Sequence, residues 1–260
     1  MKTDFSGKIA VVTGSTQGLG AAVARQMVDR GALGVVITGR DAERGVAVAE
    51  SIGARGARGV FVEADLTDPA APARVIGAAD DAFGRIDVLV NSAGITDRDT
   101  IFDSTPEFFD RMMTINTKAP WFLMQGAIKV MMREGTEGSI VNVLSISSHA
   151  GQPYIATYCA SKAALGVYTK NTANAMRKHR IRVNALNPGW MSTPAEDRIQ
   201  REYHGAVDGW AETAGTKLPF GSLIDPEDAA RAVLFLASPE SGFMTGAVVD
   251  YDQQVIGAYD

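Results

Sequence analysis

Short apolar runs alternate with longer stretches of helical periodicity along the chain. The first apolar run, residues 8–13, precedes a segment in which Leu19, Val23 and Met27 recur at four-residue spacing, which is typical of an amphipathic helix. The same pattern predicts strands over residues 8–13, 34–38, 59–62, 86–90, 139–144, 181–186 and 246–249. It predicts helices over residues 17–30, 41–52, 69–83, 106–132, 156–178 and 226–237.

These predicted strands are continuously apolar, as a sheet that is buried on both faces requires. Alternation with helices implies parallel strands joined by right-handed crossovers. Because no linker divides residues 1–260, the pattern predicts one α/β domain, a doubly wound parallel sheet. The polar stretch 190–221 follows the sixth strand, where such a sheet opens on its ligand crevice, and we expect a helical lid over the substrate there.

Composition narrows the function classes. The net charge of −5 gives no reason to expect nucleic acid or an anionic membrane as partner, and it says little about a small-molecule substrate, which is the partner we expect. A single cysteine, Cys159, fits a reducing compartment, and no apolar run suits a signal peptide or a membrane helix. We therefore expect a cytoplasmic protein. The three scattered histidines predict no metal site.

Three glycines, Gly14, Gly18 and Gly20, lie where the first strand turns into the first helix. Glycine permits a positive φ and lets the backbone approach a ligand closely. The helix N-terminus behind the turn offers free N–H groups and a positive dipole end to a diphosphate. Glycine spacing alone also fits a tight structural turn, but this placement favours a dinucleotide site.

A second group of polar residues has the chemistry for proton transfer. Tyr158 and Lys162 are four residues apart on a predicted helix, so they share one face. An ammonium nearby is expected to lower the pKa of the phenol from about 10 towards neutrality. Ser145 ends the fifth predicted strand and could hydrogen-bond a substrate oxygen, while Asn116 could hold a water beside the lysine.

Together these pieces resemble the single-domain branch of the short-chain dehydrogenase/reductase family, over nearly the whole chain. The matching motifs are Thr13-Gly14-x-x-x-Gly18-x-Gly20, Asp65, Asn91-Ser92-Ala93-Gly94, Asn116, Ser145, Tyr158-x-x-x-Lys162, and Asn187-Pro188-Gly189 followed by Thr193. The resemblance implies a Rossmann fold and an NAD(P)-dependent oxidoreductase.

The family's roles carry over to the matching positions. Tyr158 would be the general acid/base, Lys162 its pKa depressor and a ribose ligand, Ser145 the polariser of the reacting oxygen, and Asn116 the keeper of a relay water. Besides Tyr158 and Lys162, the resemblance assigns these residues to the cofactor: Gly14, Ser15, Thr16, Gln17, Gly18, Leu19, Gly20, Arg40, Asp65, Leu66, Asn91, Ala93, Gly94, Pro188, Gly189, Met191 and Thr193.

The sequence departs from the family pattern in two respects. Ser92 stands where a second asparagine is usual and keeps a small polar group. Ser145, Ser147 and Ser148 compete for the catalytic serine. Ser145 is favoured because it ends the strand, thirteen residues before Tyr158.

The choice between NADP and NAD depends on the end of the second strand. A carboxylate there accepts from the ribose 2′-OH and repels a 2′-phosphate. Gly39 occupies that place and Arg40, whose guanidinium suits a phosphate, follows it, so NADP is slightly favoured. Alternatively, Arg40 stacks on the adenine, while Asp41 caps the next helix or turns back to the ribose.

Polar and aromatic residues dominate the predicted substrate end, which suits a sugar or polyol better than an acyl chain. The candidates are Ser147, His149, Gln152, Tyr154, Trp190, Arg198 and Arg201. An anionic sugar is a narrower hypothesis, since Arg98, Arg198 and Arg201 could contact the anion. The alternatives are a 3-oxoacyl-thioester reductase of lipid synthesis and, from another class, a non-catalytic cofactor-binding regulator. The resemblance also implies a homotetramer.

Overall fold

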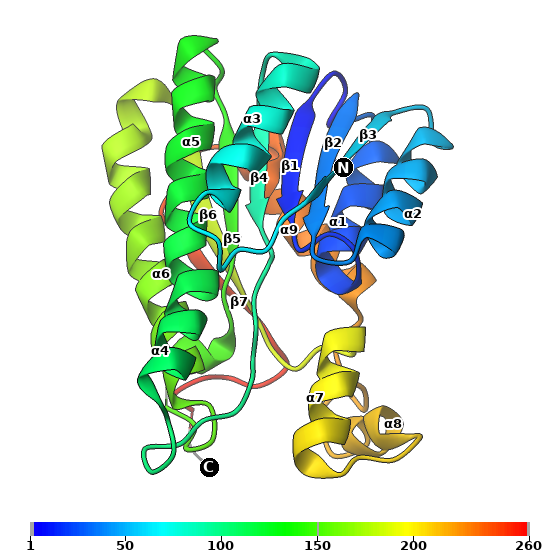
Figure 1. Cartoon of the computed structure of the whole chain (residues 1–260), viewed down its shortest axis with the longest axis vertical. Helices are drawn as coiled ribbons and strands as arrows, with labels where there is room; N and C mark the ends of the chain where they lie inside the picture. Colours follow the sequence, from blue (N-terminus) through cyan, green and yellow to red (C-terminus); the bar gives the residue numbers. More distant parts are fainter. Residues whose placement is uncertain (1–2, 150, 259–260) are drawn as a thin grey trace.

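The computed structural model describes residues 3–149 and 151–258, and seven parallel strands form its central sheet (Figure 1). The strand order is β3-β2-β1-β4-β5-β6-β7. From β1 the chain adds β2 and β3 on one side of the sheet and then β4 to β7 on the other side. This change of side between β1 and β4 is where a ligand crevice is expected, at the carboxyl ends of the two strands. The strands are β1 (Ile9–Thr13), β2 (Gly34–Gly39), β3 (Arg58–Glu63), β4 (Val88–Asn91), β5 (Ser139–Val143), β6 (Arg182–Pro188) and β7 (Val248–Tyr251).

Helices cover both faces of this sheet, and a hydrophobic core lies under each layer. One layer contains α1 (Gly18–Val28), α2 (Ala42–Gly53) and α9 (Pro226–Ala237). The other contains α3 (Ala71–Phe83), α5 (Ala119–Arg133) and α6 (Ala156–Met176).

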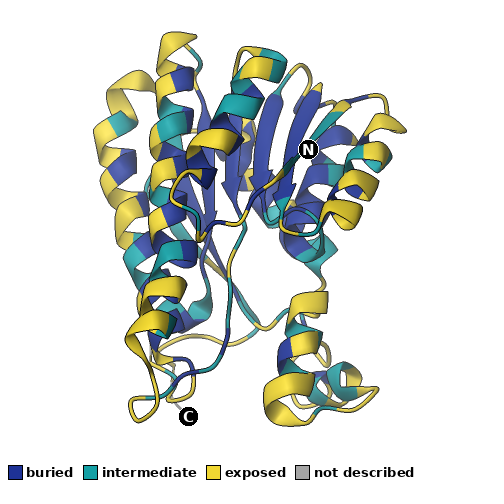
Figure 2. Ribbon diagram, viewed as in Figure 1, coloured by how far each residue is buried: buried dark blue, intermediate teal, exposed yellow. Residues whose placement is uncertain are grey.

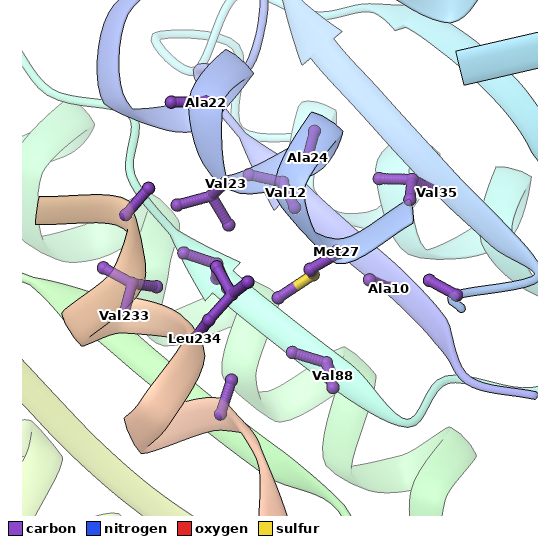
Figure 3. Close-up of a cluster of buried hydrophobic side chains, with 14 of the residues drawn as sticks. Ala10, Val12, Ala22, Val23, Ala24, Met27, Val35, Val88, Val233 and Leu234 are labelled. Carbon is purple, nitrogen blue, oxygen red and sulfur yellow. The ribbon is translucent and has the colours of Figure 1, made fainter. Parts of the chain in front are cut away.

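Successive strand residues serve the two cores in turn. Val12 of β1 packs with Val23 and Met27 of α1 and with Leu234 of α9 (Figure 3), whereas Val11 faces the opposite core. Because both faces are covered, every residue of β1 is buried, which explains why the strands read as continuous apolar runs. The predicted single domain with a doubly wound sheet is confirmed.

The long helix predicted over 106–132 is interrupted. The structure has α4 (Pro106–Met113), a π-helical turn η1 (Thr114–Lys118) and then α5. Pro120 has no N–H to donate to the carbonyl of Asn116 four residues earlier, so the ordinary helical bond is missing there. The wider turn carries Asn116, and such turns are frequent at functional sites.

The polar stretch 190–221 leaves the sheet after β6 and folds into α7 (Pro194–His204) and α8 (Trp210–Gly215). Thr193 caps α7 by accepting a hydrogen bond from the amide of Glu196 at 3.1 Å. An isolated bridge between Met191 and Ile224 brings the two ends of the excursion together. Figures 1 and 2 show α7 and α8 beyond the carboxyl ends of the strands, with much of their surface exposed.

Candidate active site

A cavity of about 1460 Å³ lies between the carboxyl ends of the strands and α7. Most of the residues that the sequence assigns to a site line this one cavity. They are Gly14, Thr16, Gln17, Gly18, Leu19, Gly20, Arg40, Asp65, Leu66, Ala93, Gly94, Ser145, Ser147, Gln152, Tyr154, Tyr158, Lys162, Pro188, Gly189, Trp190, Met191, Thr193 and Arg198.

The glycine turn forms one end of the cavity, at the N-terminus of α1. Gly14 and Gly18 have positive φ values of 62° and 54°. A Cβ at Gly14 would lie 2.7 Å from the Cα of Ala93, so the turn and the loop after β4 pack backbone to backbone. No acidic residue lies in the first turn of α1, which leaves its N–H groups and positive dipole end for an anion.

Two residues that were assigned to the cofactor are absent from the cavity wall. Ser15 is fully buried, donates to the carbonyl of Val12 at 2.6 Å and accepts from the amide of Thr38 at 3.0 Å. Asn91 is buried and donates to the side chain of Asn142 at 2.9 Å. Both therefore join neighbouring strands beneath the site.

The end of β2 forms the wall beside the glycine turn. A Cβ at Gly39 would lie 2.5 Å from Cγ2 of Thr16, so this corner has no room for a side chain at 39. Arg40 lines the cavity and has no carboxylate within ion-pair distance in the described part of the chain. Asp41 caps α2 by accepting from the amide of Arg44 at 2.9 Å and pairs with the guanidinium of Arg44 at 2.8 Å.

Tyr158 and Lys162 lie on α6, and both side chains line the cavity. The Lys162 Nζ lies 5.8 Å from the centroid of the Tyr158 ring and donates to the carbonyl of Val143 at 2.9 Å. Burial raises the pKa of Tyr158 to about 12, and burial lowers the pKa of Lys162 to about 8. The expected lowering of the phenol pKa is wrong for this structure, because desolvation outweighs the two groups that lower this pKa, Ser145 and Arg98.

Of the three candidate serines, Ser145 is the one whose side chain acts on Tyr158, where it opposes the rise in the pKa of the phenol. Its Oγ also accepts from the amide of Ser147 at 3.2 Å. Ser147 accepts from Gln152 at 3.3 Å, while Ser148 donates to Asn187 at 3.4 Å. This geometry favours Ser145, as the strand position did.

Asn116 is fully buried behind the cavity wall rather than in it. Its Oδ1 accepts from the amide of Ile95 and its Nδ2 donates to the carbonyl of Ile95, both at 2.9 Å. Nδ2 also donates to Oγ of Ser161 at 3.1 Å. A Cβ built on Gly94 would lie 3.2 Å from the Lys162 Nζ and 3.3 Å from the Asn116 Oδ1. The loop after β4, which contains Gly94, therefore packs closely against both side chains.

The substrate end is formed by the loops after β4 and β5 and by α7. Ser147, Gln152, Tyr154, Trp190 and Arg198 line it as expected. His149 does not, because it lies 2.7 Å from Asp250 and 3.0 Å from Asn187. Arg201 is also outside the cavity wall, where it pairs with Asp197 and Asp208, each at 2.9 Å.

Comparison with known proteins decides the family. The family model described as Enoyl-(Acyl carrier protein) reductase matches residues 14–253. The chain belongs to the short-chain dehydrogenase/reductase family. It is accordingly an NAD(P)-dependent oxidoreductase, which confirms the reaction class and the fold expected from the sequence.

Relatives of this short-chain dehydrogenase/reductase act on varied substrates. The NADP-dependent (R)-specific alcohol dehydrogenase of Lentilactobacillus kefiri is 36% identical, over 96% of this chain and 98% of the relative. Galactitol 2-dehydrogenase of Agrobacterium fabrum is 33% identical, over 95% and 97%. The crystal structure of L-sorbose reductase from Gluconobacter frateurii with NADPH and L-sorbose has a TM-score of 0.92 at 28% identity and full coverage of both chains.

Several cavity residues of this short-chain dehydrogenase/reductase escaped the sequence analysis. Asp252 and Gln254 come from the segment after β7, and Arg44 comes from the first turn of α2. The Oδ2 of Asp252 is buried without a hydrogen-bond partner among the described residues. A Cβ at Gly189 would lie 2.0 Å from the Asp252 Oδ1, so the two segments are in close contact. Nothing in the sequence pattern indicated this contact.

Residues 3–149 and 151–258 contain no cluster of three histidine, cysteine, aspartate or glutamate side chains suited to a metal ion. Within the same residues, no helix has the length and apolar character needed to cross a membrane.

Proposed function

We propose that this enzyme interconverts a carbinol and a carbonyl on a sugar, polyol or related hydroxy compound, with Tyr158 as the proton-transfer group. The observation that carries the proposal is that Tyr158, Lys162 and Ser145 meet in the same cavity as the glycine turn. When bound, the dinucleotide supplies the redox chemistry by taking up or giving a hydride.

Each residue of the group has a distinct part. With a pKa of about 12, the Tyr158 hydroxyl is protonated at neutral pH and can donate its proton to a carbonyl oxygen during reduction. Ser145 holds the same oxygen by a hydrogen bond and opposes the rise in the phenol pKa. Lys162, with a pKa of about 8, keeps most of its charge at pH 7 and stabilises the phenolate that remains.

Asn116 acts through the backbone around it. Its side-chain amide hydrogen-bonds both the N–H and the carbonyl of Ile95. Ile95 belongs to the loop after β4, which forms the cavity wall beside Lys162. Pro120 leaves the Asn116 carbonyl without its usual helical donor, which makes that carbonyl suitable for a relay water. We assign to Asn116 the support of the proton path rather than contact with the substrate.

The cofactor is proposed to be NADP. A phosphate on the adenosine ribose suits Arg40, which lacks a carboxylate partner in the described structure, and the tight contact between Gly39 and Thr16 keeps a competing carboxylate out. The relative from L. kefiri is NADP-dependent and the L-sorbose reductase was solved with NADPH. Arg40→Gln should raise the Km for NADP⁺ by about 10- to 100-fold and leave that for NAD⁺ nearly unchanged.

A sugar or polyol is favoured because the substrate end offers hydrogen-bonding side chains beside aromatic surfaces. Gln152, Glu196 and His204 provide the polar groups, and Tyr154 and Trp190 provide the aromatic ones. Galactitol and L-sorbose are the substrates named for the two relatives of that kind. A long acyl chain would leave these polar groups unpaired, so the 3-oxoacyl-thioester alternative is the weaker one.

The deciding experiment is a panel of aldoses, ketoses, polyols and sugar acids with NADP⁺ or NADPH, followed by absorbance of the reduced cofactor. A 3-oxoacyl thioester is included as the rival substrate. Turnover of the hydroxylated compounds above that of the thioester is expected. Faster turnover of the thioester would contradict the substrate assignment, and no turnover of any compound would favour a cofactor-binding regulator.

Residues 190–221 are proposed to close over the substrate as a lid of the single 1–260 domain. Arg198 of α7 reaches Asp97 in the loop after β4 at 3.0 Å, which joins the excursion to the body. Asp97 is buried and also binds Arg111 at 2.8 Å. Arg198→Gln is expected to raise the Km of the substrate more than that of the cofactor, because it frees the lid.

We also propose a cytoplasmic homotetramer. Phe122 on α5 and Val167 and Tyr168 on α6 are exposed apolar side chains that a neighbouring subunit would cover. Light scattering on the purified protein should give four times the chain mass of 27.5 kDa. Val167→Glu should lower that mass, and fractionation of the native cells tests the location.

A further inference from the structure

The substrate end contains an arginine without a carboxylate partner in the described residues. Four arginines line the cavity: Arg40 and Arg44 at the adenosine end, and Arg98 and Arg198 at the substrate end. Arg44 pairs with Asp41, and Arg198 pairs with Asp97 and Glu202. Arg40 and Arg98 are therefore the two cavity arginines without an ion-pair partner among the described residues. Arg40 suits the ribose phosphate of the cofactor, but that phosphate does not account for the charge of Arg98 at the other end.

The charges of the neighbouring arginines are already compensated. Arg111 pairs with Asp97 at 2.8 Å, and Arg201 pairs with Asp197 and Asp208, each at 2.9 Å. Arg98 is half-buried, and among the described residues its hydrogen-bond partners are the His204 ring and the Thr96 carbonyl, neither of which is a carboxylate. A guanidinium withdrawn from water without a counter-ion gains most from an anionic ligand.

Neighbouring side chains hold Arg98 in a defined position. Its Nε donates to Nε2 of His204 at 3.1 Å and its Nη1 donates to the carbonyl of Thr96 at 2.8 Å. The guanidinium carbon lies 5.5 Å from the ring centroid of Tyr154, which in turn packs edge-on against His204 at 5.9 Å. These contacts occupy Nε and Nη1, so Nη2 has N–H groups to offer a ligand in the cavity.

Arg98 shares its cavity with the reacting group. Arg98, Glu196 and Tyr158 all line this one cavity. The positive charge of Arg98 also lowers the pKa of Tyr158, although desolvation dominates and raises that pKa. One substrate molecule can therefore place an anionic group at Arg98 while it presents its oxygen to Tyr158.

We propose that the substrate is a hydroxylated anion, a sugar or polyol derivative whose carboxylate, sulfonate or phosphate group binds Arg98. This deepens the proposed function and depends on it for the reaction but not for binding. Arg98 specifies the anion, whereas Glu196 accepts from hydroxyl groups. Trp190 and Gln200 each donate to Oε1 of Glu196 at 2.8 Å, which fixes that carboxylate for its task.

The kinetic test uses matched pairs: a hexose against its hexuronic acid, its 6-phosphate and its 6-sulfonate, with NADP⁺ at saturation. We expect at least one anionic member to have a kcat/KM about tenfold or more above that of the neutral hexose. Arg98→Gln should lower kcat/KM for that anion by about 10- to 100-fold and change the neutral sugar by less than about threefold. Arg201→Gln is the control, since Arg201 lies on the same lid outside the cavity wall.

Loss of both neutral and anionic turnover in Arg98→Gln would overturn the proposal, because it would show that Arg98 only supports His204 and Tyr154. A neutral sugar preferred by the wild type would overturn it as well. If no compound is turned over, the proposed function fails, and calorimetric titration of each pair into the NADP⁺-loaded protein still decides this inference. Tighter binding of an anion that Arg98→Gln removes supports it, and equal binding within each pair overturns it.

Discussion

The methyl group of Thr16 occupies the space in which a side chain at Gly39 would begin. A Cβ at position 39 would lie 2.5 Å from Cγ2 and 2.9 Å from Oγ1 of Thr16. The glycine turn and the end of β2 therefore limit each other's side chains. Arg40 is the arginine at this end of the cavity that has no ion-pair partner among the described residues. Cofactor choice is thus tied to packing as well as to charge.

A carboxylate introduced at this corner should not by itself convert the enzyme to NAD. We expect Gly39→Asp to lose stability by about 1–3 kcal/mol through overpacking against Thr16 and to weaken NADP⁺. The double variant Gly39→Asp with Thr16→Ala should regain much of that stability and show a higher NAD⁺ to NADP⁺ ratio of kcat/KM than the wild type. Thermal unfolding and steady-state kinetics of both variants measure this. A single variant as stable as the wild type would contradict the steric argument.

Much of this site followed from the sequence because its parts lie at the ends of predictable elements. Gly14 had to follow the first strand, Ser145 had to follow the fifth, and the period of a helix placed Lys162 one turn from Tyr158. Parallel strands bring such positions to one edge of a sheet, so local pattern was enough to gather them.

Contacts between segments distant in sequence could not be found in this way. Asp252, directly after β7, contacts Gly189, directly after the neighbouring strand β6. His149 does not line the cavity but contacts Asp250. The direction of the Tyr158 pKa shift also depends on how deeply the fold buries the ring, which spacing does not reveal. Such properties arise from tertiary packing.

Removal of the phenol hydroxyl should stop the chemistry and spare the cofactor. Tyr158→Phe keeps the ring that packs beside Lys162, so we expect NADP⁺ binding within about threefold of the wild type and kcat lower by about 100- to 10,000-fold. Tryptophan fluorescence titration and steady-state assays test the two parts. Retention of wild-type turnover would remove Tyr158 from its role.

The two directions of the reaction should respond differently to pH. The raised pKa of Tyr158 keeps the phenol protonated at neutral pH, which suits donation to a carbonyl, whereas oxidation of a carbinol needs the phenolate. We expect the oxidation rate to rise between about pH 6 and 10, because the phenolate fraction grows up to the pKa of about 12, and the reduction rate to stay nearly constant over the same range. Initial rates in both directions with one substrate pair measure this. An oxidation rate independent of pH would contradict it.

The buried ammonium of Lys162 should cost stability that an uncharged side chain restores. Burial lowers its pKa from 10.5 to about 8, so the unfolded chain binds more protons between these values and stability rises with pH across that window. At pH 7 the difference corresponds to about 3 kcal/mol. We expect Lys162→Met to unfold at a higher temperature than the wild type at pH 7, with the gain shrinking towards pH 10.5, while turnover is lost. Lys170→Met, at an exposed position of α6, is the control and should show neither effect. A less stable Lys162→Met at pH 7 would mean that the hydrogen bond to Val143 outweighs the desolvation of the charge.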